Sequence, residues 1–200
     1  MRNVIFDLGN VLIEWDPALA FADVFTTRDA AEAWLDEIGF HDWNRAQDGG
    51  RSFAEGIAAA RAQHGDRARW LEGYLAAFPV TIENPVPGSW DILEELAARA
   101  VPLFALTNWS AESWPAATEL HPRLSLFRDV LVSGQEGLLK PDAAIYQRLL
   151  DRNGLLAGES IFIDDSLANV EGARAVGLDA IHFTDAGALR AELRQRGLLG

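Results

Sequence analysis

The chain has 200 residues, 49% of them hydrophobic, which is enough to bury the core of one large domain or of a domain with a sizeable insertion. It has no cysteine, which excludes disulfides, thiolate metal sites and cysteine nucleophiles and leaves carboxylates as ligands for a hard metal such as Mg²⁺. The net charge of −13 opposes binding to nucleic acid or to an anionic membrane, because both require a basic surface.

The location and partners follow from similar arguments. No stretch approaches roughly eighteen consecutive apolar residues, and the N-terminus enters a predicted strand without the features of a signal peptide. We therefore expect a soluble, cytoplasmic protein, either a monomer or a homodimer. A small anionic substrate remains compatible with the acidic chain if a metal ion, a lysine or a helix N-terminus compensates its charge locally.

The first predicted strand leads directly to an aspartate. Val4 to Phe6 is a short apolar run typical of a buried parallel strand, Asp7 follows it, and Gly9 and Asn10 favour a tight turn. Open α/β sheets place their chemistry just beyond the carboxyl ends of strands, which makes Asp7 a candidate catalytic residue. The alternative is that Asp7 only caps the next segment.

Only helical signals lie between this strand and the next one. Asp16 and Pro17 predict a short helix that runs through about Phe25. Further signals are an apolar face over residues 30–38, a capping box at Ser52 to Glu55 that opens a helix to about Gln63, and an apolar stripe from Trp70 to Phe78. About seventy helical residues exceed an ordinary crossover connection. We expect a helical cap domain over residues 16–83, inserted into a core formed by residues 1–15 and 84–200.

Strands and helices alternate after a Pro- and Gly-containing linker at residues 83–88. The predicted strands are 103–106, 130–132, 161–163 and 180–183. The predicted helices lie around Trp90 to Ala97, at 111–120, 141–150 and 167–176, and at the C-terminus. This pattern predicts an α/β fold, a doubly wound Rossmann-like parallel sheet core with an inserted all-helical cap domain.

Polar residues follow two further strands of this predicted core. Thr107 and Asn108 follow the second strand, where a hydroxyl and an amide would lie beside Asp7 if the strands are neighbours; alone, such a pair is also a common loop or helix cap. Lys140 precedes a helix that opens at Pro141. A lysine there is ordinarily a solvated charge, but a helix N-terminus is also a place where anions bind.

A pair of carboxylates ends the fourth predicted strand. Asp164 and Asp165 are adjacent and repel each other, so something must offset their charge. A divalent cation shared with Asp7 is the simplest means. Each of the four strand ends is a weak signal by itself, but their ordered succession is a strong one.

Together these stretches resemble the four motifs of the haloacid dehalogenase (HAD) superfamily. The motifs are Phe6-Asp7-Leu8-Gly9-Asn10-Val11, Leu106-Thr107-Asn108, Lys140-Pro141, and Ile163-Asp164-Asp165-Ser166 with Asn169-Val170-Glu171-Gly172-Ala173. The resemblance covers the whole chain, including the cap inserted after the first strand. It is closest to bacterial sugar phosphatases of the α-glucose-1-phosphatase type, which share the Asp-Leu-Gly-Asn opening and a segment similar to residues 139–146.

The resemblance implies a Mg²⁺-dependent phosphomonoester hydrolase that acts on a small phosphorylated metabolite, with a sugar phosphate as the expected substrate. Asp7 would attack phosphorus and form an aspartyl-phosphate. The implied metal ligands are Asp7, the Gly9 backbone carbonyl and Asp165, with Asp164 helping to hold the metal. The implied phosphate-binding groups are Thr107, the Asn108 backbone and Lys140.

One position departs from the family pattern. Most phosphatases of the family have a second aspartate two residues after the nucleophile, which protonates the leaving oxygen, whereas this chain has Gly9. A sugar 1-phosphate needs that acid less, because its anomeric oxygen is a better leaving group. Glu14, Asp16 and His41 are the candidate replacements, although each also fits a surface or capping role.

Two other functions are compatible with Gly9. A 2-haloacid dehalogenase uses the same aspartate without a metal, but the pair Asp164 and Asp165 would then carry uncompensated charge. A non-catalytic protein that binds phosphorylated metabolites is the second alternative, and the retention of Asp7, Lys140 and Asp165 together argues against it.

The cap contains one segment that could read the substrate. The four histidines of the chain show no metal-ligand spacing, and His64 and His121 fit loops or helix ends. His41 lies in a polar and aromatic cluster from Phe40 to Arg45, which we expect to interrupt the cap helices and to face the active site with Trp15. The alternative is an ordinary helix connection with a buried Trp43.

Overall fold

Five short apolar segments form one parallel sheet in the computed structural model, which describes residues 2–200. The strands are β1 (Asn3–Phe6), β2 (Leu103–Thr107), β3 (Asp129–Val132), β4 (Ser160–Asp164) and β5 (Asp179–His182), in the order β3-β2-β1-β4-β5. The chain proceeds from β1 to β2 and β3 in one direction and then crosses to β4 on the other side of β1. The topological switch point, where open α/β sheets bind ligands, therefore lies between β1 and β4.

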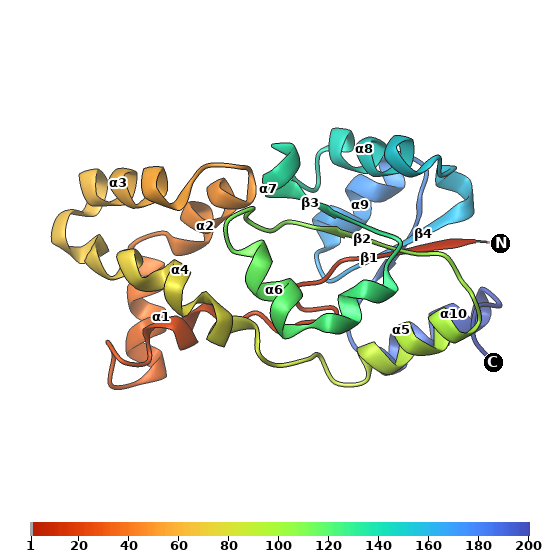
Figure 1. Cartoon of the computed structure of the whole chain (residues 1–200), viewed down its shortest axis with the longest axis horizontal. Coiled ribbons are helices and arrows are strands. Elements are labelled where there is room, and N and C mark those ends of the chain that lie inside the picture. The colour runs from red at the N-terminus through yellow and green to blue at the C-terminus, as the bar shows by residue number, and fades with distance from the viewer. Residues whose placement is uncertain (1) are drawn as a thin grey trace.

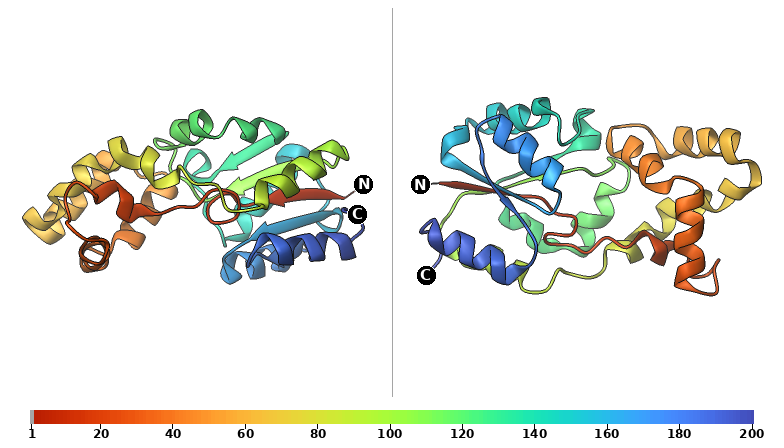
Figure 2. Two further views of the ribbon diagram at one scale, coloured as in Figure 1. Left: turned by 90° about the horizontal axis from the view of Figure 1, so that it is seen from below. Right: turned by 180° about the vertical axis from the view of Figure 1, so that it is seen from behind.

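Alternate side chains of the strands enter two separate cores, because successive residues of a strand point to opposite faces. Ile5 and Phe162 pack with helices α8 (Ala143–Asn153) and α9 (Leu167–Ala175). Phe6 and Ile163 belong to the other core, which includes residues of α5 (Ser89–Ala98) and α10 (Ala186–Gln195). Figure 2 shows these helices on opposite sides of the sheet. The predicted α/β fold is confirmed.

The segment between β1 and α5 contains only helices, and they lie together beyond one end of the sheet (Figure 1). The α-helices are α1 (Arg28–Glu37), α2 (Phe40–Asp48), α3 (Phe53–His64) and α4 (Tyr74–Ala77), and the 3₁₀ segments are η1 (Pro17–Phe21), η2 (Gly65–Gly73) and η3 (Phe78–Ile82). Both termini lie at the opposite end of the molecule. The remaining short elements belong to the core and are α6 (Trp114–Leu120), η4 (Pro122–Leu126), α7 (Ser133–Glu136) and η5 (Ala157–Glu159).

An aromatic core holds the cap helices together. The buried ring of Tyr74 lies with its centroid 5.1 to 6.0 Å from those of Phe21, Phe40, Phe53 and Phe78. These rings come from separate helical segments, so their burial supplies the packing that such short helices lack as isolated peptides. The apolar stripe from Trp70 to Phe78 thus serves helix packing.

Two local predictions for the cap are wrong and one is confirmed. Residues 40–45 do not interrupt the helices, because Phe40 to Arg45 lie within α2, which begins after Gly39 in the left-handed conformation. The helix expected to run from Pro17 to about Phe25 is a 3₁₀ segment that ends at Phe21, with Asp16 as its cap. The capping box of Ser52 and Glu55 is present at the start of α3.

Two antiparallel segments connect the cap to the core. The Glu14 backbone N–H donates to the carbonyl of Asn84 at 2.9 Å, and the Val86 N–H donates to the carbonyl of Leu12 at 2.9 Å. The chain therefore leaves and re-enters the sheet side by side. Within residues 2–200, every helix is too short or too polar to cross a membrane.

Candidate active site

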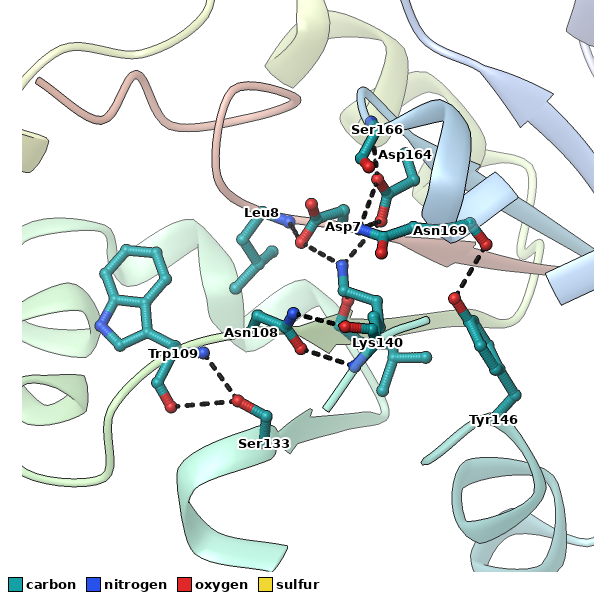
Figure 3. Close-up of polar contacts among 11 residues, drawn as sticks. Asp7, Leu8, Asn108, Trp109, Ser133, Lys140, Tyr146, Asp164, Ser166 and Asn169 are labelled. Atoms are coloured by element: carbon teal, nitrogen blue, oxygen red, sulfur yellow. Dashed lines mark hydrogen bonds and ion pairs between the residues drawn. The ribbon is translucent and has the colours of Figure 1, made fainter. Parts of the chain in front are cut away.

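The strand register places the predicted site residues at one edge of the sheet. Phe6 of β1 pairs with Ile163 of β4, so Asp7 and Asp164, which follow these two residues, are neighbours across the switch point. β2 lies on the other side of β1 and carries Thr107 at its end. Sequence segments more than a hundred residues apart thus contribute to one group of polar side chains (Figure 3).

Lys140 lies at the centre of this group and is completely buried. Its Nζ is 2.8 Å from Asp7 Oδ1, 2.7 Å from Asp164 Oδ2 and 3.0 Å from the carbonyl oxygen of Leu106. An ammonium group has three hydrogens, and each of them has an acceptor here. Lys140 therefore fixes the two carboxylates and supplies positive charge to the site.

The side chain of Asn108 holds the backbone of Lys140 in place. Its Oδ1 accepts from the Lys140 N–H at 2.9 Å, and its Nδ2 donates to the Lys140 carbonyl at 3.1 Å (Figure 3). Arg45 of the cap donates to the same carbonyl at 3.1 Å. These contacts connect the loop that carries the lysine to the residue after β2 and to the cap, so the backbone of Lys140 is held from two sides.

Asp164 is the most deeply buried carboxylate of the site. It is fully buried, and its Oδ1 accepts hydrogen bonds from the Ser166 backbone N–H at 2.8 Å and from Asn169 Nδ2 at 2.9 Å. With Lys140 on Oδ2, both carboxylate oxygens have partners. A buried carboxylate needs hydrogen-bond partners, and this one in turn orients Lys140.

Charge is unevenly compensated around Asp7. Burial raises the pKa of Asp7 to about 7; Lys140 opposes this rise, whereas Asp164 and Asp165 add to it. Burial also raises the pKa of Asp165, with a further contribution from Asp164. Burial alone would lower the pKa of Lys140, but its contacts with Asp7 and Asp164 outweigh that effect and raise it. The site thus holds three carboxylates against one ammonium group.

The three carboxylates fit a hard divalent cation. Asp7, Asp164 and Asp165 each offer an oxygen, and these oxygens lie within 4.8 Å of one another. Mg²⁺ prefers oxygen ligands and needs only one or two carboxylates, together with substrate phosphate and water. Because one positive charge faces three negative ones, the donor set fits this ion in chemistry and in charge.

A cavity of about 190 Å³ opens at Asp7. Six of the seven predicted site residues line it, namely Asp7, Gly9, Thr107, Asn108, Lys140 and Asp165, and the seventh is the buried Asp164. Trp15, Phe78 and Trp109 contribute aromatic surface to the wall. The lining of the cavity therefore combines polar groups with aromatic surface.

The predicted replacements for the missing acid lie elsewhere. Glu14, Asp16 and His41 line a separate open cleft of about 870 Å³ and do not line the cavity at Asp7. Asp16 is moreover paired with Arg28 at 2.6 Å. The carboxyl group that the cap contributes to the cavity is Asp48, which the sequence did not single out. Its only local signal is a carboxylate at a helix end before two glycines, which is common in loops.

The three cap residues Trp43, Asn44 and Arg45 have different surroundings. Trp43 is buried in the cap, where its Nε1 donates to the Gly56 carbonyl at 2.8 Å, as the alternative reading of this segment expected. Asn44 lines the cavity at Asp7. Trp15 also lines this cavity and borders the larger cleft as well.

The chain is similar to known hydrolases. The model of a family described as haloacid dehalogenase-like hydrolases matches residues 1–177. The chain is 29% identical over 201 residues to the sesquiterpene phosphatase astK of Aspergillus oryzae, covering 97% of this chain and 95% of that protein. It is 30% identical over 190 residues to a phosphoglycolate phosphatase of Rhodospirillum rubrum, covering 90% of this chain and 78% of that protein.

A solved structure shares the fold. The HAD family enzyme bt-2542 from Bacteroides thetaiotaomicron, crystallised in complex with magnesium and inorganic phosphate, superimposes with a TM-score of 0.67. The two chains are 21% identical, and the match covers 92% of this chain and 95% of that one. At this identity the likeness concerns the fold alone.

Proposed function

Because the chain belongs to the haloacid dehalogenase-like hydrolases, we propose that it is a Mg²⁺-dependent phosphomonoesterase that forms an aspartyl-phosphate on Asp7. The observation that carries this proposal is the arrangement of Asp7, Lys140 and Asp165 around one cavity at the switch point of the sheet. The phosphatases among its relatives support the same reaction class.

In this mechanism Asp7 acts as the nucleophile. The contacts from the Leu8 backbone N–H at 2.7 Å and from Lys140 both use Oδ1, so Oδ2 is the oxygen that they leave for attack on phosphorus. The P–O bond to the alcohol breaks as the bond to Asp7 forms. Water then attacks phosphorus, releases inorganic phosphate and regenerates the carboxylate.

The remaining predicted residues would bind the phosphoryl group and the metal. The Asn108 backbone N–H has no partner among residues 2–200, so it is free for a phosphate oxygen, and Thr107 lines the same part of the cavity. Asp7, the Gly9 carbonyl and Asp165 would hold Mg²⁺, with Asp164 behind them. When bound, the ion would neutralise charge on the phosphoryl group.

Lys140 acts in two ways under this proposal. Its charge favours the ionised, nucleophilic form of Asp7, against the effect of burial. As the substrate arrives, its ammonium group can also exchange a contact with Asp7 for one with a phosphate oxygen. This exchange would couple phosphate binding to the release of the nucleophile.

For the substrate we propose a sugar phosphate of the kind that α-glucose-1-phosphatase-type enzymes hydrolyse. A cavity of about 190 Å³ accepts a phosphoryl group with a small organic group. Aromatic rings such as Trp15 and Phe78 pack against the C–H face of a sugar, and Asn44 offers an amide to its hydroxyl groups. The same aromatic wall also favours an apolar organic phosphate, the class suggested by the sesquiterpene phosphatase.

A panel of phosphate esters tests the function. We expect Mg²⁺-dependent hydrolysis of p-nitrophenyl phosphate and a preference within a set of glucose 1-phosphate, glucose 6-phosphate, 2-phosphoglycolate and an isoprenoid monophosphate. Asp7→Asn should abolish turnover of every ester, because it removes the nucleophile. Release of chloride from 2-chloropropionate in chelator would instead show a dehalogenase. Binding of phosphate without any turnover would show a non-catalytic protein.

A further inference from the structure

The proposed reaction needs a proton for the leaving oxygen, and the inference drawn here rests on that proposed function. Gly9 occupies the position where most family phosphatases carry the acid. Among residues 2–200, the carboxyl groups that line the cavity at Asp7 belong to Asp7, Asp48 and Asp165. Asp7 is the nucleophile and Asp165 belongs to the carboxylate cluster beside it. Asp48 is the carboxyl group without another role.

The position of Asp48 is fixed by contacts between the cap and the core. It is the last residue of α2, and its backbone carbonyl accepts a hydrogen bond from Ser133 Oγ at 2.6 Å. Ser133 begins α7, which lies next to α2 where the cap meets the core (Figure 1). Asn44, one turn earlier on α2, donates to Asp48 Oδ2 at 3.1 Å. The carboxyl group is therefore held on the cap side of the same cavity that Asp7 lines.

The surroundings of Asp48 suit proton transfer near neutral pH. Burial raises its pKa to about 7, although the charge of Arg45, the backbone amide of Ser110, the side chain of Asn44 and the charge of Lys140 all oppose the rise. Tyr74 of α4 is the further titratable group that Asp48 influences, and it stays protonated because burial raises its pKa. A general acid works best when its pKa lies near the operating pH.

We propose that Asp48 of the cap is the general acid and base of this enzyme, in place of the carboxyl group missing at Gly9. Its proton passes to the alcohol oxygen as the P–O bond breaks, which leaves Asp48 as a carboxylate. That carboxylate then takes a proton from the water that attacks the aspartyl-phosphate. Each turnover thus converts one ester and one water into alcohol and phosphate, and Asp48 returns to its protonated state.

The chain also offers a matched rescue. A Cβ added to Gly9 would meet no atom within 4 Å, and Gly9 lies outside the left-handed region that only glycine tolerates well. Gly9→Asp should therefore fit without backbone strain. It would place a carboxyl group where most family phosphatases have it.

The test compares leaving groups in Asp48→Asn, which keeps the size and a hydrogen-bond acceptor of the side chain. The value of kcat/KM reports the step in which the alcohol leaves. We expect it to fall by about 10²–10⁴-fold on alkyl phosphates and by much less on p-nitrophenyl phosphate, whose leaving oxygen needs no proton. The later hydrolysis should also slow, so p-nitrophenyl phosphate should show a burst of nitrophenolate. Gly9→Asp in the same chain should restore alkyl phosphate turnover at least about tenfold.

Asp42→Asn, an exposed aspartate on the same helix, is the control and should match the wild-type protein. The activity of Asp48→Asn on the aryl ester shows at the same time that the variant is folded. An unchanged dependence on the leaving group, or an equal loss on aryl and alkyl esters, would falsify the role of Asp48 while the phosphatase function stands. A wild-type protein that hydrolyses no ester would overturn the proposed function itself.

Discussion

At the scale of single residues, the site is governed by one buried cation among carboxylates. Lys140 contacts Asp7 and Asp164 and has no exposed surface, so its charge compensates groups that water cannot reach. Removing one partner of such a buried arrangement costs more than the arrangement contributes, because the remaining charges are left unpaired. The lysine is therefore as important for folding as for the proposed chemistry.

Lys140→Met tests this role. We expect the free energy of unfolding to fall by about 3–5 kcal/mol at pH 8 in chelator, because two buried carboxylates lose their counter-charge. Without the lysine, the pKa of Asp7 in the folded protein should rise further above its unfolded value near 3.9. A carboxyl group with a raised folded pKa contributes stability below its unfolded pKa, and this contribution is lost as the pH rises through the folded pKa. Thermal melting at pH 5 and at pH 8 should thus show the smaller loss at pH 5. An equal loss at both pH values would contradict the charge argument.

Asp48→Asn should stabilise the protein at high pH. The folded pKa of about 7 exceeds the unfolded value, so the wild-type chain loses stability as pH rises from about 4 to about 7. The variant lacks this loss, so at pH 8.5 its free energy of unfolding should exceed that of the wild-type protein by about 2 kcal/mol, which corresponds to about 4–8 °C in Tm. This is roughly half the full linkage value, because the side chain is only partly buried. A difference in Tm between the two proteins that stays constant from pH 5 to pH 8.5 would refute the raised pKa.

At the scale of secondary-structure elements, a capping box fixes the start of the cap helix α3. Ser52 accepts a hydrogen bond from the Glu55 backbone N–H, and the Glu55 side chain accepts one from the Ser52 N–H. This exchange satisfies two backbone donors at the start of α3 that have no partner inside the helix. The helix contributes no residue to the cavity at Asp7, so its cap concerns stability alone.

Ser52→Ala should therefore separate stability from activity. We expect a cost of about 1 kcal/mol, which corresponds to about 2–4 °C in Tm for a chain of this size. The kcat/KM on p-nitrophenyl phosphate at 25 °C should stay at the wild-type value. A large change in activity with an unchanged Tm would show that the start of α3 influences the site directly.

At the scale of the whole molecule, the cavity lies between two structural parts. Asn44, Asp48 and Phe78 reach it from the cap helices, and the remaining lining residues come from the sheet edge and the segments that follow the strands. The chain as a whole carries a net charge of −13, so an anionic substrate is repelled everywhere except where positive charge is concentrated. In this site that charge comes from Lys140 and, under our proposal, from Mg²⁺.

Magnesium should consequently affect both activity and stability. Removal with EDTA should abolish phosphatase activity, and added Mg²⁺ should restore it. Because a ligand that binds only the folded state raises its stability, Mg²⁺ should also raise the Tm of the wild-type protein. Asp165→Asn should lose most of this shift while it remains folded in chelator. A Tm that does not respond to Mg²⁺ would contradict metal binding by the folded protein, and an undiminished shift in Asp165→Asn would place the metal outside this carboxylate cluster.

Local patterns along the chain predict the sheet and most of the residues at its edge. Short apolar runs such as Val4 to Phe6 form strands because their side chains must leave water on both faces, and the turn residues after Asp7 end the strand locally. The parallel order of strands then brings their carboxyl ends to one edge, which is why Asp7, Thr107 and Asp164 could be predicted to gather. Lys140 follows α7 and reaches them from a loop.

The contribution of the cap to the cavity depends instead on long-range packing. Helix α2 runs through Phe40 to Asp48 because the rings of Phe40 and Trp43 pack into the cap core, a contact that the local polar pattern does not reveal. Asp48 reaches the cavity because Ser133, 85 positions away in the chain, binds the end of that helix. The position of Glu14, Asp16 and His41 in a different cleft depends equally on this packing. Sequence patterns reflect contacts between residues that are close in the chain. Which of Glu14, Asp16 and Asp48 lines the cavity at Asp7 depends on how the cap packs against the core.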